Sequence, residues 1–145
     1  MNVIPTEYKI LGGLGLAAAL FFGIKSVLQK NPAKDTVRES QREVDKLAGK
    51  LTYSMTWYKQ AADTLQSAMF DAGTNEDSIF RIFKQLKNGK DLYQLIAAFG
   101  VRPYRTFGVK QGDYNLSQWF NEELSSGETD TLNKILKSNK IAFQF

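Results

Sequence analysis

The chain has 145 residues, the size of a single domain, and contains neither cysteine nor histidine. Disulfides, thiol catalysis, Cys/His zinc sites and imidazole-based triads are therefore excluded. Nineteen basic and 15 acidic residues leave a net charge of +4 without a dense basic stretch, so a nucleic-acid partner is not expected. Carboxylate chemistry, metal binding through oxygen and adhesion remain open.

The first feature in chain order is an uncharged apolar run at residues 10–24, ILGGLGLAAALFFGI. As a helix this run would span roughly 22 Å, and extending it past Lys25 to residue 28 gives roughly 28 Å, close to the ~30 Å hydrocarbon core of a bilayer. We therefore expect a transmembrane anchor over residues 1–30. A secretory signal peptide and a buried core helix are the alternatives, although the run lacks a strongly basic start and a clean cleavage site.

The flanks of this run predict its orientation. One basic residue precedes it and seven fall in residues 25–50, so the positive-inside rule predicts a single-pass protein with its C-terminal part in the cytoplasm. Gly15, Ala19 and Gly23 form a stripe of small residues on one helix face, through which such helices can associate as homo-oligomers.

Residues 31–50 are expected to form a helical stalk or linker. Pro32 breaks the preceding helix, charges of alternating sign follow, and Val37 and Val44 contribute to only a narrow apolar stripe. A short coiled coil is the alternative, but the run covers only about two heptads.

From residue 51 to residue 145, apolar residues recur at helical spacing and predict a compact module of five short helices. Thr74 and Asp91 are expected to be helix N-caps, and helices are expected to begin near residues 116 and 129. The overall prediction is an all-α protein: an anchor, a stalk and a helical module.

Two segments of this module are expected not to be helical. Pro103, Gly108 and Gly112 indicate a loop of roughly a dozen residues. The tail at residues 141–145 alternates like a strand without an obvious partner strand, so we expect it to pack on the helices as an extended end.

Two motifs of the module resemble the annexin repeat, a unit of five helices. The first runs from Ala62 through Met69 to Gly73-Thr74-Asn75-Glu76-Asp77, and the second is Asn-Glu-Glu-Leu-Ser-Ser-Gly at residues 121–127. The resemblance covers about residues 51–139. A single repeat behind an apolar N-terminal segment is also similar to small membrane proteins of bacteria and phages.

The resemblance implies a Ca²⁺ site on the loop of the first motif. Its ligands would be the backbone carbonyls of Met69, Asp71 and Gly73 and the carboxylate of Glu123. Ca²⁺ prefers such oxygen ligands, and the bound ion could bridge to an anionic lipid head group. Asp71 stands where the family has glycine, and one repeat is present where soluble annexins stack four. The alternative is that the loop is only a structural junction between helices.

The acidic residues give no convincing catalytic pair. Glu122 and Glu123 are adjacent and would point about 100° apart on a helix, which leaves Asp113 with Glu123 as a weak glycosidase-like pair. We therefore expect a non-enzymatic, membrane-anchored structural or adaptor protein whose module binds a protein partner or lipid head groups. A Ca²⁺-dependent membrane-binding module and a structural membrane component of a lipid-containing phage virion are the alternatives.

Overall fold

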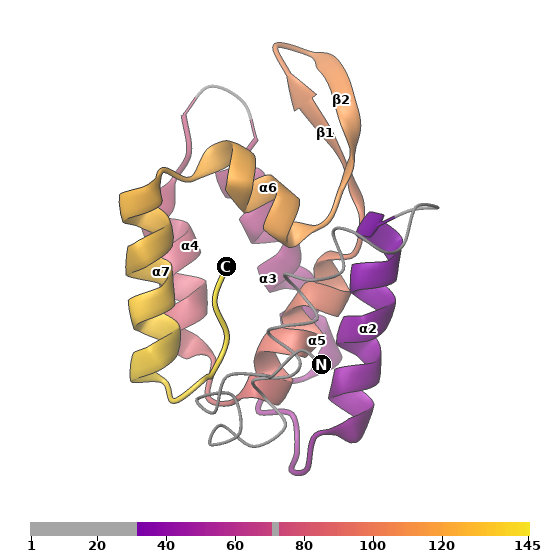
Figure 1. The fold of residues 1–145 in the computed structure, drawn as a ribbon, viewed down its shortest axis with the longest axis vertical. Helices are drawn as coiled ribbons and strands as arrows, with labels where there is room; N and C mark the ends of the chain where they lie inside the picture. The colour runs from indigo at the N-terminus through magenta and orange to yellow at the C-terminus, as the bar shows by residue number, and fades with distance from the viewer. Residues whose placement is uncertain (1–31, 71–72) are drawn as a thin grey trace, which may run out of the picture.

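The structure of the protein is a computed structural model that describes residues 32–70 and 73–145 (Figure 1). This part of the chain forms six helices and one antiparallel hairpin. The helices are α2 (Pro32–Lys46), α3 (Met55–Ala68), α4 (Glu76–Gln85), α5 (Gly89–Phe99), α6 (Leu116–Glu123) and α7 (Ser126–Ser138). The strands are β1 (Arg102–Thr106) and β2 (Val109–Tyr114).

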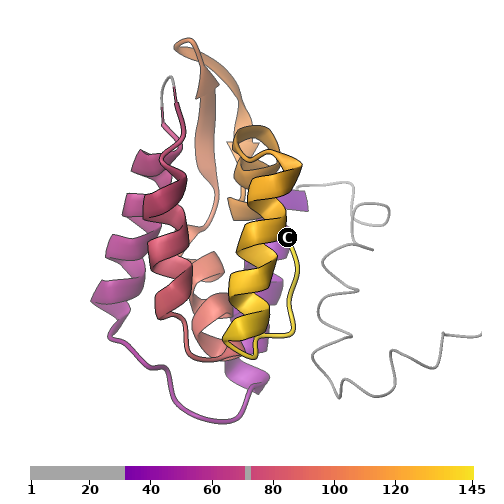
Figure 2. The ribbon, with the colours of Figure 1, turned by 90° about the vertical axis from the view of Figure 1, so that its left-hand side faces the viewer.

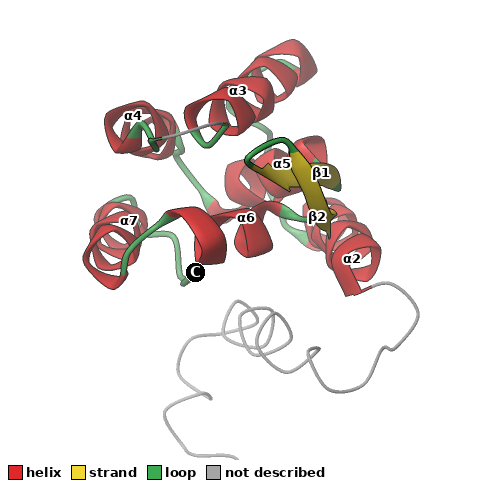
Figure 3. Ribbon diagram, turned by 90° about the horizontal axis from the view of Figure 1, so that it is seen from above, coloured by secondary structure: helices red, strands yellow, loops and turns green. Residues whose placement is uncertain are grey.

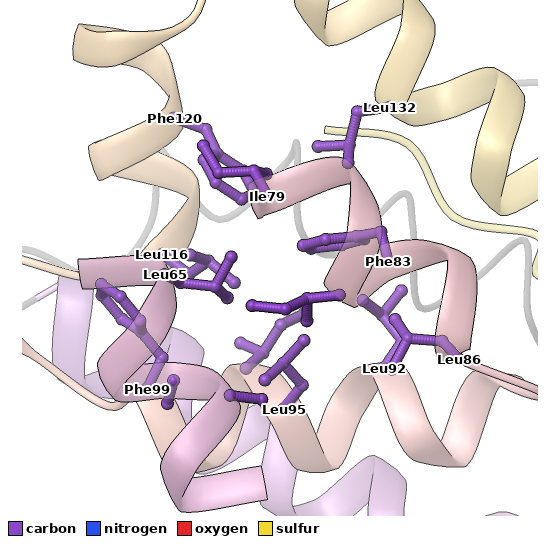
Figure 4. Close-up of a cluster of buried hydrophobic side chains, with 14 of the residues drawn as sticks. Leu65, Ile79, Phe83, Leu86, Leu92, Leu95, Phe99, Leu116, Phe120 and Leu132 are labelled. Carbon is purple, nitrogen blue, oxygen red and sulfur yellow. The ribbon is translucent and has the colours of Figure 1, made fainter. Parts of the chain in front are cut away.

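The core lies where the apolar faces of the helices meet. Helix α3 packs against α4 and α5, and α4 packs in turn against α7 (Figure 2). Leu65, Phe83, Leu95 and Leu132 come from these four helices in chain order, and each is fully buried (Figure 4). The helical periodicity of the sequence therefore identifies this core correctly. Met55 shares the helical spacing of the buried residues of α3 but is 48% exposed.

The helix expected within residues 31–50 is present as α2, and it packs against the module. It lies along α5, with Ser40 and Val44 buried (Figure 1). Lys90 of α5 donates hydrogen bonds of 3.1 Å to the carbonyls of Leu47 and Gly49, which fixes the turn after α2. The described part of the predicted stalk is thus joined to the helical body.

The C-terminal tail packs on the helices in an extended conformation, as expected. Ile141 and Phe143 are buried, and the Phe145 ring packs against Phe83 with 5.7 Å between ring centroids. The Asn133 side chain fixes the tail by accepting from the amide of Phe145 and donating to its carbonyl.

The all-α prediction is wrong, because a β-hairpin replaces the expected loop. Thr106 pairs with Val109, so Phe107 and Gly108 alone form the turn, with φ values of 49° and 79°. Positive φ at both central positions is the signature of the tight turn that matches strand twist. The hairpin projects from one end of the helical body (Figures 1 and 2).

The residues read as loop signals all have a place in this hairpin. Pro103 lacks an amide donor, which an edge strand tolerates, and both strands of a two-stranded sheet are edges. At Gly112 a Cβ atom would lie only 2.5 Å from the Tyr114 ring, so the absence of a side chain admits that ring.

The transmembrane part of the fold prediction is also not found in the structure. None of the described helices is both long and apolar enough to cross a bilayer. The predicted anchor at residues 1–30, with its stripe of Gly15, Ala19 and Gly23, lies outside the described residues.

Three helix starts differ from those predicted. Asn75, and not Thr74, caps α4 by accepting from the amide of Ser78. Asn88 caps α5, which places Asp91 inside the first turn. Helix α7 begins three residues before the predicted Thr129, because Ser125 and Glu128 form a capping box.

Candidate functional site

Glu123 joins three separate segments at the hairpin end of the molecule. Its Oε2 accepts a 2.8 Å hydrogen bond from the Thr74 hydroxyl, just before α4, and its Oε1 accepts a 2.6 Å bond from the Tyr104 hydroxyl of β1. We call Glu123, Thr74 and Tyr104 the Glu123 junction. The junction ties the hairpin and the α3–α4 connection to the last residue of α6.

Tyr104 anchors the base of the hairpin. It is buried, stacks on Tyr114 of β2 with ring centroids 5.1 Å apart, and meets Trp119 of α6 edge-to-face at 4.9 Å. Burial, together with the hydrogen bond that it donates to Glu123, raises the pKa of Tyr104 to about 12. The phenol therefore remains a protonated donor across the physiological range.

Arg102 fixes the start of the hairpin. Its guanidinium forms a 2.9 Å ion pair with Asp63 and donates a 2.6 Å hydrogen bond to Gln66, both on α3. It also lies 4.7 Å from the centroid of the Phe99 ring. Arg102 and Tyr104 thus attach β1 to α3 and to α6.

The predicted calcium ligands are only partly brought together. Glu123 does lie at the loop of the first motif, as its bond to Thr74 shows. However, both of its carboxylate oxygens accept hydrogen bonds from hydroxyls, so the one side-chain ligand that the resemblance offers is already engaged. Met69 is buried at the end of α3, Gly73 follows with φ 108°, and Asp71 lies outside the described residues.

Acidic groups elsewhere in residues 32–70 and 73–145 do not form a metal-binding cluster. No three of their carboxylates gather closely enough to hold an ion. Asp113, the other half of the weak glycosidase-like pair, forms an ion pair of 2.9 Å with Lys110 on its own strand.

A second engaged carboxylate is Asp91, which is completely buried. It accepts hydrogen bonds from the Tyr58 hydroxyl (2.6 Å), the Thr52 hydroxyl (2.7 Å) and amide (2.9 Å), and the Lys87 amide (3.0 Å). Burial alone would raise the pKa of Asp91, but these donors together hold it below its ordinary value. With its acceptor positions taken, Asp91 joins the segment before α3 to the start of α5 and is not available as a ligand.

Among the described residues, the most exposed large apolar side chains lie at the end of the hairpin. Phe107 is 97% exposed and Val109 is 64% exposed. We call residues 106–109 the hairpin tip. Sequence reasoning missed this surface, because Phe-Gly is not one of the dipeptides that mark a two-residue hairpin turn.

The helical body carries a shallow hollow of about 240 Å³ between α3 and α4. It is lined by Trp57, Gln60, Ala61, Thr64, Ser78, Arg81, Ile82 and Gln85. Arg81 is the single charged side chain in this lining, so the hollow offers no acid–base pair.

Comparisons with known proteins find no similar protein. No family model, curated protein or solved structure matches the chain. The resemblance to the annexin repeat therefore stays a prediction from the two motifs.

Proposed function

We propose that the protein is a membrane-anchored adaptor whose helical module carries an interaction surface on its β-hairpin. The observation that carries this proposal is an exposed aromatic tip on a firmly held support. Phe107 is almost fully exposed at the turn, while Tyr104, four residues from Gly108, is buried and bonded to Glu123. Exposed aromatic side chains on a preorganised support are typical of binding surfaces.

The proposed attachment to a membrane rests on the sequence. Residues 10–24 are uncharged and apolar, and seven basic residues follow within residues 25–50. Such a run partitions into a bilayer, and the basic flank favours the cytoplasmic side for the module. This arrangement would hold the hairpin close to a membrane surface.

The calcium-dependent alternative has less support. Coordination by Glu123 would have to compete with the hydroxyls of Thr74 and Tyr104, which bond its two carboxylate oxygens. We therefore favour an adaptor that acts through its surface side chains.

Fractionation of cells that express the full chain tests the attachment. We expect the protein to stay in membranes washed with alkaline carbonate, and the double variant Leu16→Arg/Leu20→Arg to be extracted. Each arginine at the centre of an apolar span costs about 2.5–3.5 kcal/mol of insertion free energy. Met55→Arg, a matched change at a half-exposed site of α3, should remain in the pellet. Extraction of the unchanged chain by carbonate would refute the anchor.

A further inference from the structure

Phe107 occupies a position that local stability does not explain. Its side chain is 97% exposed, so it adds almost nothing to packing, and its φ of 49° is strained for a residue with a large side chain. Asparagine or glycine is preferred at this position of a two-residue hairpin turn. A residue that breaks a local rule without a gain in packing points to function.

The fold places this tip at the end of the module where the N-terminal segment joins it. Helix α2 begins at the end of the body from which the hairpin projects (Figures 1 and 2). Thirty-one residues precede α2, and their apolar run ends at residue 24, eight positions before Pro32. A bilayer that holds residues 10–24 would therefore meet the module from the end at which α2 begins.

Two basic side chains on this side suit an anionic surface. Arg105 is exposed beside the tip and, like Lys34 in the first turn of α2, has no carboxylate partner within the described residues. The acidic residues Glu76 and Asp77 begin α4 at this same end (seen from above in Figure 3), next to Thr74 of the Glu123 junction, so the attraction would come from the basic side chains nearest the tip and the first turn of α2. Basic residues near a membrane surface are attracted to anionic lipids.

We propose that the hairpin tip inserts Phe107 and Val109 into the head-group region of the same bilayer that holds residues 10–24. The aromatic ring enters the boundary between head groups and acyl chains, and Arg105 contacts the phosphate of an anionic lipid. The partner is thus a lipid surface, and the second contact fixes the orientation of the module on it. This inference rests on the proposed membrane attachment.

The absence of cysteine allows a direct test, because one introduced cysteine can be labelled uniquely. Val109→Cys in the full chain, labelled with an environment-sensitive fluorophore, is reconstituted into vesicles of phosphatidylcholine and phosphatidylglycerol in equal parts. We expect the label at position 109 to emit at a shorter wavelength in these vesicles than the same labelled protein in detergent-free buffer. We also expect nitroxide lipids in the same vesicles to quench this emission. Ser138→Cys, an exposed site at the far end of α7, is the matched control and should report water.

Two further substitutions identify the side chain responsible. Phe107→Asn in the Val109→Cys background should abolish the spectral shift and the quenching, whereas Phe107→Leu should retain most of both. Asparagine suits the turn, so this variant keeps the fold, and an unchanged thermal melt by circular dichroism verifies that.

Each alternative occupant of the tip gives a different result. A water-exposed probe in vesicles that carry the protein through flotation and a carbonate wash would overturn the hairpin contact and leave the anchor intact. A shifted probe that nitroxide lipids do not quench, and that depends on protein density, would identify a second copy and overturn the lipid contact. Quenching only by nitroxide lipids in separately added vesicles would place the contact on another bilayer and overturn the proposal. Failure to float would refute the attachment and this inference with it.

Discussion

At the scale of single residues, the structure uses two carboxylates as connectors. Asp91 and Glu123 each accept from hydroxyl groups of distant segments, and the described contacts of both are with neutral donors. Hydrogen bonds to a charged group are stronger than neutral ones, and buried donors left without an acceptor are costly. These two positions should therefore be sensitive even to conservative changes.

Asp91→Asn should lower the free energy of unfolding by about 3 kcal/mol, because one acceptor oxygen becomes a donor that faces the Tyr58 and Thr52 groups. Urea denaturation followed by circular dichroism measures this loss. Asp130→Asn, the same change at an exposed position of α7, should leave the midpoint unchanged. Equal midpoints for the two variants would show that Asp91 does not connect α5 to the segment before α3.

Tyr104→Phe should lower the free energy of unfolding by about 1.5 kcal/mol, because the hydrogen bond to the Glu123 carboxylate is lost while the ring stays in place. Tyr114→Phe is the control, since this half-buried ring stacks on Tyr104 and belongs to the same hairpin. We expect the free energy of unfolding of the control, measured by denaturation, to lie within about 0.5 kcal/mol of that of the unchanged protein. A loss shared equally by both variants would contradict the special role of the Glu123 junction.

At the scale of elements, backbone conformation decides where helices end. Gly100 follows α5 with φ 65° and lets the chain turn into β1, so a left-handed residue is required there. Gly127 lies in the first turn of α7 with open space around its Cα atom. The same substitution should therefore have opposite effects at these two glycines.

Gly100→Ala should destabilise the protein by about 1 kcal/mol, and Gly127→Ala should stabilise it by about 0.5–1 kcal/mol. The first change forces a side chain into a left-handed conformation, and the second removes backbone freedom from the unfolded chain. Thermal melts of the two variants give both signs in one experiment. Stabilisation by Gly100→Ala would mean that α5 does not end in a left-handed turn.

The helices could be predicted from the sequence, whereas the hairpin could not. Apolar spacing marks α3 and α4 because each buries one face, whereas α5 is buried at every position from 91 to 96 and is marked by its apolar residues. The strands bury little: β2 has no fully buried residue, so an alternating pattern is absent. Pro103 and Gly112 then favour a loop as much as an edge strand.

The candidate site was predictable only in part. Glu123, which the annexin-like resemblance assigns to the loop of the first motif, accepts a hydrogen bond from Thr74 of that loop. The motifs give no information on Tyr104, which approaches Glu123 from the unpredicted hairpin. The exposed tip was missed for the same reason, since its position depends on a turn that the sequence analysis read as loop.

At the scale of the whole molecule, several buried phenols respond to alkaline pH together. Burial raises the pKa of Tyr58, Tyr93 and Tyr104 above the ordinary value of about 10, to about 12 for Tyr104. Hydrogen bonds to Asp91 and Glu123 add to the shifts of Tyr58 and Tyr104, and the charges of Glu43 and Glu39 add to that of Tyr93. In the unfolded chain these groups would lose their protons at lower pH.

The free energy of unfolding should therefore stay unchanged below about pH 10 and decrease as the pH rises towards 12. In that interval the three tyrosines lose their protons readily only in the unfolded chain. Urea midpoints measured across this range test the trend. Tyr93→Phe should reduce the alkaline loss without weakening the protein at neutral pH, since the Tyr93 hydroxyl has no hydrogen-bond partner within the described residues. A midpoint that stays constant up to about pH 11 would contradict these raised pKa values.

The aromatic tail contacts rings that are synthesised well before it. Phe145 packs on Phe83 and Phe120, which precede it by 62 and 25 residues, so these contacts form only after Phe145 has left the ribosome. Ribosomes add ~5–20 residues per second, which leaves these rings uncovered for seconds. Residues 10–24 emerge long before the tail. A nascent chain captured through them would pass this aggregation-prone interval at a membrane, and Phe145 would make its ring contacts there.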